Sequence, residues 1–212
     1  MSAMQLAPDD VLVVVDVQRD FLPGGALAVP DGDAVIAPIN WLGGVFGHVL
    51  LTQDWHPPGH VSFAASHPGR TPFDTIELQY GRQVLWPTHC VQGTEGAELA
   101  SGLELARAEA VIRKGFRPGV DSYSAFTEAD RTPTGLAGYL RERGARRIFF
   151  AGLATDFCVS WSALDARTAG FDVVVIEDAC RAIDVQGSLD QAWRAMNEAG
   201  VERRNSGELR AL

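Results

Sequence analysis

The run VLVVV at residues 11–15 consists entirely of aliphatic residues, and Asp16 follows it directly. β-Branched side chains favour an extended backbone. A run that is apolar at every position is typical of a strand buried on both faces of a parallel sheet. These five residues therefore predict a buried strand, and with it an α/β fold in which helices cover the sheet.

The rest of the chain repeats this unit. Similar apolar runs predict further strands at residues 48–52, 110–112, 147–150 and 172–176, and a last short strand near Val201. Helical patterns cover residues 34–46, 134–143, 159–169 and 188–199. Glycine follows each of the last three patterns, where a left-handed residue commonly ends a helix. Strands that alternate with helices predict an α/β domain with a mostly parallel sheet.

The chain length bounds the domain organisation. With 212 residues and no linker-like segment, the sequence predicts a single domain over residues 1–212. One connection, residues 54–108, is unusually long and rich in proline, glycine and histidine, and it holds four of the five histidines. Connections of that length inside a compact domain are often functional.

Charge and composition argue against several kinds of partner. The formal net charge is −9, which disfavours nucleic acids and anionic membranes. No apolar run approaches the roughly 20 residues that span a bilayer, and the N-terminus lacks the basic and apolar segments of a secretory signal. The three cysteines are few and widely spaced, so we expect no disulfide framework and a cytoplasmic location.

Chemically active residues follow the predicted strands. Asp16 follows the first, Asp54 and His56 the second, Lys114 the third and Cys158 the fourth. Ligands of open α/β sheets bind beyond the carboxyl ends of the strands, so we expect these side chains to meet at one edge. The alternatives are ordinary: a solvated lysine at 114 and a strand-terminating acid at 16. No glycine fingerprint follows the first strand, which argues against a dinucleotide site.

Cys158 lies where the fourth predicted strand has ended and a helix begins. By residue type alone it would be a small buried hydrophobe. Its position favours a nucleophile, because a helix N-terminus and a nearby lysine both lower the pKa of a thiol. Thr155 or Asp156 is the expected N-cap of that helix. Cys180 follows two acidic residues, which disfavour a thiolate, and is interpreted as structural.

The long connection contains a candidate metal site. Asp54 and His56 are two residues apart, so in an extended segment their side chains point the same way, and His89 can supply a third ligand. Three protein ligands with open positions fit a catalytic or substrate-binding ion, and this donor set suits zinc, iron or manganese. Cys90 adjoins His89, but the same alternation turns it away. The alternative is a set of exposed loop histidines.

Motifs around these residues identify a family. The segments that carry the resemblance are VVVDVQRDFLPGGALAV, LTQDWHPPGHVSFAASHPG, VLWPTHCVQGTEGAEL, RKGFRPGVDSYSAF, GLATDFCVSWSALDA and VIEDACRAID. They cover nearly the whole chain, and they resemble the nicotinamidases, also called pyrazinamidases, of the isochorismatase-like cysteine hydrolase superfamily. Asp16, Lys114 and Cys158 in these contexts are typical of the superfamily. The motifs DWH and WPTHC are typical of the nicotinamidase branch.

The resemblance implies a three-layer fold, with helices on both faces of a mostly parallel central sheet. It implies a catalytic triad of Asp16, Lys114 and Cys158. It also implies a divalent metal ion, zinc before iron or manganese, held by Asp54, His56 and His89. His60 matches a further histidine ligand of the family only approximately, since its spacing differs by one residue, and it is left as a group that acts on the ion indirectly.

Further implied features concern the substrate. A cis peptide bond is implied between Leu153 and Ala154, with an oxyanion hole formed by the N–H groups of Ala154 and Cys158. Aromatic walls of a pyridine pocket are implied at Phe21, Trp86 and Tyr123. The implied reaction converts nicotinamide to nicotinate and ammonia, and pyrazinamide to pyrazinoate, through a cysteine thioester in NAD salvage. The implied partner is the small-molecule substrate; a homo-oligomer is left open.

Three other functions stay open at this point. The first is a hydrolase for carbamoyl or ureido substrates, which would share the triad and need no metal. The second is a metallohydrolase in which the ion activates water and Cys158 is structural. The third is a binding or redox-sensing protein with an exposed reactive cysteine. Metal content, thiol alkylation and turnover distinguish these functions.

Overall fold

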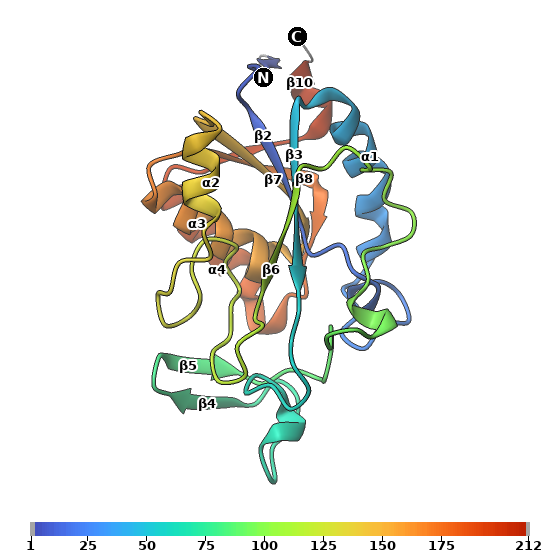
Figure 1. The fold of residues 1–212 in the computed structure, drawn as a ribbon, viewed down its shortest axis with the longest axis vertical. Coiled ribbons are helices and arrows are strands. Elements are labelled where there is room, and N and C mark those ends of the chain that lie inside the picture. Colours follow the sequence, from blue (N-terminus) through green and yellow to red (C-terminus); the bar gives the residue numbers. More distant parts are fainter. Residues whose placement is uncertain (1–2, 211–212) are drawn as a thin grey trace.

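The computed structural model describes residues 3–210, and its centre is a six-stranded parallel sheet in the order β6-β3-β2-β7-β8-β9 (Figure 1). The strands are β2 (Val11–Val15), β3 (His48–Asp54), β6 (Ala110–Lys114), β7 (Arg147–Leu153), β8 (Asp172–Arg181) and β9 (Glu202–Arg204). β2 pairs with both β3 and β7 and is buried at every position. The VLVVV run at residues 11–15 is therefore an inner strand of the sheet.

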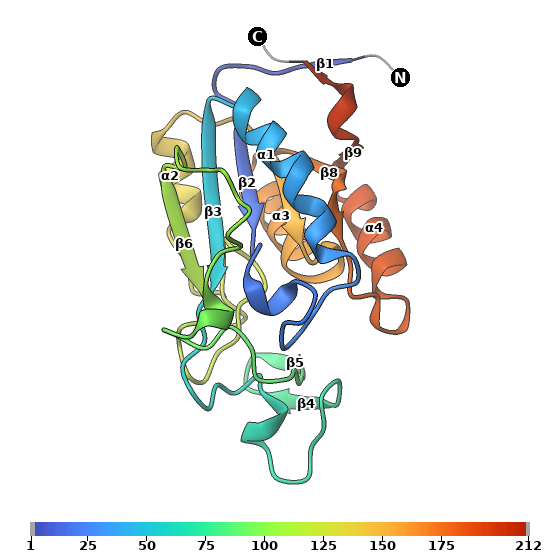
Figure 2. The ribbon, with the colours of Figure 1, turned by 90° about the vertical axis from the view of Figure 1, so that its right-hand side faces the viewer.

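Helices cover both faces of this sheet. They are α1 (Ile36–Val45), α2 (Leu136–Glu142), α3 (Ser160–Thr168) and α4 (Ser188–Glu198). α1 lies on one face and the other three lie on the opposite face (Figures 1 and 2). Leu12 and Val14 of β2 belong to the core beneath α1, whereas Val11, Val13 and Val15 belong to the core beneath α2, α3 and α4. The three-layer α/β prediction is confirmed.

Some element bounds differ from the predicted ones. The third predicted helix, at 159–169, begins at Ser160 after a π-helical turn over Thr155–Val159. The first, at 34–46, is preceded by a 3₁₀ turn over Gly32–Val35. β3 and β6 run further than predicted, so Asp54 and Lys114 are the last residues of their strands. The two strands remain paired through these polar residues. A prediction based on apolar runs ends each strand too early, because it stops at the first polar residues.

The connection over residues 54–108 has structure of its own. It contains the antiparallel hairpin of β4 (Thr75–Leu78) and β5 (Gly81–Val84), which lies beyond the carboxyl ends of β3 and β6 (Figure 1). A two-stranded parallel pair joins β1 (Met4–Gln5) to β10 (Leu209–Arg210) near the termini. Neither pair was predicted, because strands of two to four residues show no clear periodicity. Within residues 3–210, no helix is long and apolar enough to cross a membrane.

Gly152 of β7 pairs with Val15 of β2 and leaves no room for a side chain. This glycine has a φ of 120°, and a Cβ at this position would lie 2.1 Å from the carbonyl oxygen of Val15. We expect Gly152→Ala to destabilise the protein by about 3 kcal/mol or more, through backbone strain and displacement of β2. For a chain of this size that corresponds to a melting temperature lower by roughly 6–12 °C, measured by thermal unfolding.

Gly44→Ala is the matched control. Gly44 is exposed in α1, and an added Cβ would meet nothing within 4 Å. Alanine is the better helix former by about 1 kcal/mol, so the melting temperature should stay the same or rise slightly. Equal melting temperatures for the two variants would contradict the close approach at Gly152.

Candidate active site

The ammonium group of Lys114 lies where the carboxyl ends of β2, β3, β6 and β7 meet. Its Nζ is 2.8 Å from Asp16 Oδ2 and 3.2 Å from Cys158 Sγ, and it donates hydrogen bonds to the Asp54 carboxylate and, at 3.1 Å, to the Ser122 carbonyl oxygen. Lys114 and Asp54 are register partners across β6 and β3, which sets them side by side. The structure therefore brings the three predicted triad residues together.

Burial and charge decide the protonation of this group. Burial by itself lowers the pKa of Lys114, but the Asp16 and Asp54 carboxylates outweigh it and raise that pKa well above its usual value. Burial, supported by the charge of Asp54, raises the pKa of Asp16. Burial also raises the pKa of the Cys158 thiol well above its usual value, although Lys114 opposes the shift. The expectation of a lowered thiol pKa is wrong, so Cys158 would need a base to act as a nucleophile.

The turn that carries Cys158 is held from its far side. The expectation that Thr155 or Asp156 caps the helix is also wrong, since Ala154 occupies the N-cap position without a side-chain hydrogen bond. The Asp156 carboxylate instead accepts the backbone N–H groups of Ile183 (3.1 Å) and Asp184 (2.8 Å) and the hydroxyl of Ser188 (2.6 Å). Asp156 thus ties the nucleophile turn to the loop before α4. The peptide bond between Leu153 and Ala154 is cis, as expected.

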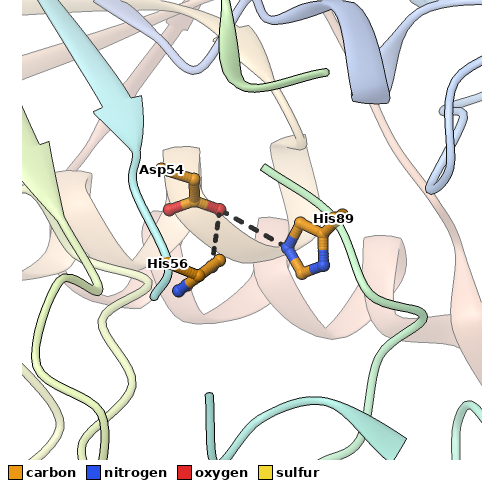
Figure 3. Close-up of side chains that lie close together, drawn as sticks. All are labelled: Asp54, His56 and His89. Atoms are coloured by element: carbon orange, nitrogen blue, oxygen red, sulfur yellow. Dashed lines mark ion pairs between the residues drawn. The ribbon is translucent and has the colours of Figure 1, made fainter. Parts of the chain in front are cut away.

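Asp54, His56 and His89 face one another beyond the end of β3 (Figure 3). His56 Nε2 lies 3.6 Å and His89 Nε2 lies 3.8 Å from the same carboxylate oxygen, Asp54 Oδ2. Two ligands at about 2.1 Å from a tetrahedral ion are roughly 3.4 Å apart. The spacing of these donor atoms therefore fits a single divalent ion between them.

Backbone carbonyls orient both imidazole rings. His56 Nδ1 donates to the carbonyl oxygen of Gly115 at 2.9 Å, and His89 Nδ1 donates to that of Pro87 at 2.8 Å. With the proton on Nδ1, each Nε2 presents a lone pair to the space beside Asp54, the arrangement usual for metal-binding histidines. The residues present thus fit a metal ion in donor type, spacing and orientation.

His60 lies against this set with both ring nitrogens engaged. Its ring is 4.4 Å from that of His56, while Nδ1 contacts the Ser62 hydroxyl at 2.7 Å and Nε2 contacts the Val120 carbonyl oxygen at 3.2 Å. His60 also forms a second group of candidate metal ligands with His56 and Asp121, whose ligand atoms all lie within 4.8 Å of one another. Among residues 3–210, Cys90 belongs to no group of candidate metal ligands and is fully buried in the core beneath α1.

A pocket joins the two groups. Its walls include every predicted pocket, oxyanion and metal residue together with the predicted nucleophile: Phe21, Asp54, His56, Trp86, His89, Tyr123, Ala154 and Cys158. The Trp86 indole N–H donates to the Tyr123 hydroxyl at 2.9 Å, and the Phe157 ring packs edge-on against Trp86 at 4.8 Å. These rings wall a space suited to a small aromatic molecule. A more open hollow beside the β4–β5 hairpin contains none of these residues.

Several residues of the site were not predicted. Leu27, Asp121, Phe157 and Ile183 also line the pocket. The Thr52 hydroxyl is hydrogen-bonded to the Asp16 carboxylate, and the Gln18 side chain bonds both the N–H and the carbonyl of Asp54 at 2.8 Å. The sequence does show polar residues at the ends of apolar runs, and a buried polar residue needs a hydrogen-bond partner. The sequence does not show which residue that partner is.

Comparison with known proteins agrees with this geometry. Residues 10–206 match the isochorismatase domain family. The chain is 57% identical to a nicotinamidase from Acinetobacter baylyi over 204 residues, which span 96% of this chain and 95% of that protein.

Solved structures give the same relationship. A nicotinamidase/pyrazinamidase from Acinetobacter baumanii superposes with a TM-score of 0.94 at 58% identity, covering 95% of this chain and 98% of that one. PnC1 from L. infantum, in complex with nicotinate, gives 0.88 at 42% (99% and 100% covered). The pyrazinamidase of Pyrococcus horikoshii, in complex with zinc, gives 0.77 at 35% (93% and 99% covered). This chain belongs to the isochorismatase family, in the branch that contains the nicotinamidases.

Proposed function

We propose that this protein hydrolyses nicotinamide to nicotinate and ammonia, accepts pyrazinamide as well, and serves NAD salvage. The observation that carries the proposal is one aromatic-walled pocket with the Cys158–Lys114 pair at one end and the Asp54–His56–His89 set at the other. The similarity to nicotinamidases from several organisms supports it, as does the nicotinate held by the L. infantum relative.

The first half of the reaction forms a thioester. Asp16 accepts the Cys158 thiol proton while the Lys114 ammonium stabilises the thiolate, and the sulfur attacks the carboxamide carbon. The N–H groups of Ala154 and Cys158 donate to the oxygen that becomes negatively charged; one such donor contributes about 3–4 kcal/mol. Asp16 then returns the proton to the amide nitrogen, the C–N bond breaks, and ammonia leaves.

The second half releases the acid. Asp16 removes a proton from a water molecule, and the oxygen attacks the thioester carbon. The same N–H groups stabilise the second oxyanion. The C–S bond breaks, nicotinate leaves, and Cys158 regains its proton. The raised pKa of Asp16 suits a group that gains and loses a proton in each half.

The proposed resident cofactor is one divalent ion held by Asp54, His56 and His89, with zinc as the first candidate because the P. horikoshii relative holds zinc. When bound, the ion supplies a Lewis-acidic contact for the pyridine ring nitrogen. The neighbouring Phe21, Trp86 and Tyr123 side chains pack against the ring and keep water away from it. Orientation of this kind matters, since a misplacement of about 1 Å can cost on the order of 100-fold in rate.

The primary test measures ammonia release from nicotinamide by the purified protein. We expect activity that is lost after chelation and lost after alkylation of Cys158, because the proposal requires both an ion and a thiol. Loss after chelation alone would indicate metal-activated water, and loss after alkylation alone would indicate thiol chemistry on nicotinamide that needs no metal ion. Absence of ammonia release by the metal-loaded protein would refute nicotinamide as the substrate.

Cys158→Ala should lower kcat by a factor on the order of 10³ or more. Without the thiol no thioester forms, and only substrate binding and oxyanion stabilisation remain. Mass spectrometry of the wild-type enzyme quenched during turnover should show the nicotinoyl adduct on the Cys158 peptide. The control is Cys180→Ala: Cys180 is equally buried but lies outside the pocket, so its activity should stay within about threefold. Turnover by Cys158→Ala would rule out the thioester.

His56→Ala should lose most of its bound metal and raise KM at least about tenfold, because substitutions around metal sites typically cost 10–100-fold. Elemental analysis measures the metal separately from activity. His48→Ala is the control, since His48 begins the same strand at the opposite end of the sheet and contacts Glu109. Unchanged metal content and KM in His56→Ala would remove the histidine from the proposed ligand set.

A further inference from the structure

We propose that Thr52 is a positioning residue for the thiol chemistry: its hydroxyl fixes the Asp16 carboxylate so that Oδ2 remains as the acceptor for the Cys158 proton. The inference rests on the proposed function, because it assigns to Asp16 the role of base. It goes beyond that function by assigning the orientation of the base to a residue that does not line the pocket.

Thr52 makes two hydrogen bonds to the same residue. Its Oγ1 accepts the backbone N–H of Asp16 at 3.1 Å and donates to Asp16 Oδ1 at 2.6 Å. Both residues are fully buried, 36 positions apart in the sequence. The last register pair between β2 and β3 is Val14 with Leu51, and Asp16 then turns to a φ of 47°. The threonine hydroxyl therefore holds the base where backbone pairing between these strands has ended.

The other carboxylate oxygen, Asp16 Oδ2, forms an ion pair with the Lys114 ammonium and accepts a hydrogen bond from no other group. An ammonium group has three N–H donors, and those of Lys114 are directed to Asp54, to the Ser122 carbonyl and to Cys158. Asp16 Oδ2 lies 2.8 Å from Lys114 Nζ, yet it is one of only two buried side-chain oxygen or nitrogen atoms within residues 3–210 that lack a hydrogen-bond partner. Because no group other than the Lys114 ammonium contacts Oδ2 in this way, a second lone pair of this oxygen can still accept a proton.

The reacting sulfur is near this carboxylate. One Asp16 carboxylate oxygen and Cys158 Sγ are within 4.8 Å of each other. Because Thr52 occupies Oδ1, the carboxylate cannot turn without breaking that hydrogen bond. Loss of the hydroxyl should therefore slow transfer of the thiol proton and leave substrate binding nearly unchanged.

The test uses a series at position 52 of the metal-loaded enzyme. Thr52→Val keeps the shape and removes the hydroxyl, while Thr52→Ala and Thr52→Ser differ from each other only by a hydroxyl. We expect kcat to fall about 10–100-fold in the valine and alanine variants, part of the usual contribution of a general base, with KM within about twofold. The serine variant should recover most of the loss. Thr127→Val is the control, since Thr127 donates to Asp165 away from the pocket.

A second readout needs no amide substrate. The rate at which iodoacetamide modifies Cys158, followed on its peptide by mass spectrometry, should fall in parallel with kcat in the valine and alanine variants. Serine and alanine variants with equal kcat and equal alkylation rates would overturn the proposal, and so would a change confined to KM or metal content. Wild-type protein that releases no ammonia would refute the proposed function, whereas the alkylation series would still test Thr52.

Discussion

The site depends on the ion pairs that the buried Lys114 ammonium group forms with Asp16 and Asp54. A lysine without exposure to solvent is destabilising unless carboxylates compensate the lost hydration. Here Asp54 does so from the end of the neighbouring strand β3, and Asp16 does so from the residue after β2, the next strand of the sheet. Asp54 has a second partner set, because its other oxygen faces His56 and His89. One carboxylate thus joins the Lys114 ammonium to the two histidines, so neither half of the site is built independently of the other.

The parallel sheet explains why these charges meet. All six strands run in one direction, so the residues at their carboxyl ends lie at one edge of the sheet, beneath the connection that contributes His89. This much follows from the sequence, because VLVVV predicts a strand buried on both faces and glycine predicts the ends of three helices. The convergence of Asp16, Lys114 and Cys158 follows from the same rule about strand ends.

Other features depend on contacts between residues far apart in the chain. The local sequence predicts Asp156 as an N-cap. Its carboxylate instead accepts hydrogen bonds from Ile183, Asp184 and Ser188, which lie far along the chain. The thiol pKa was predicted from a helix terminus and a lysine, but complete burial beside two carboxylates outweighs both. The β4–β5 hairpin could not be predicted, because hydrophobic periodicity is recognised only over longer segments than its four-residue strands. The contact of Thr52 with Asp16 could not be predicted either, because a single hydroxyl group does not change the hydrophobic pattern of a strand.

The complete burial of β2 has a consequence for how the sheet is aligned. A strand with one polar face resists a one-residue slip, because the slip would expose its apolar side chains. Residues 11–15 are apolar on both faces, so hydrophobicity alone distinguishes the correct alignment from a shifted one only weakly. A shift of one residue would, however, separate Asp16 from Thr52 and Lys114 and leave a charge unpaired in the interior. The buried polar groups proposed to perform the chemistry therefore also favour the correct register of the strands that carry them.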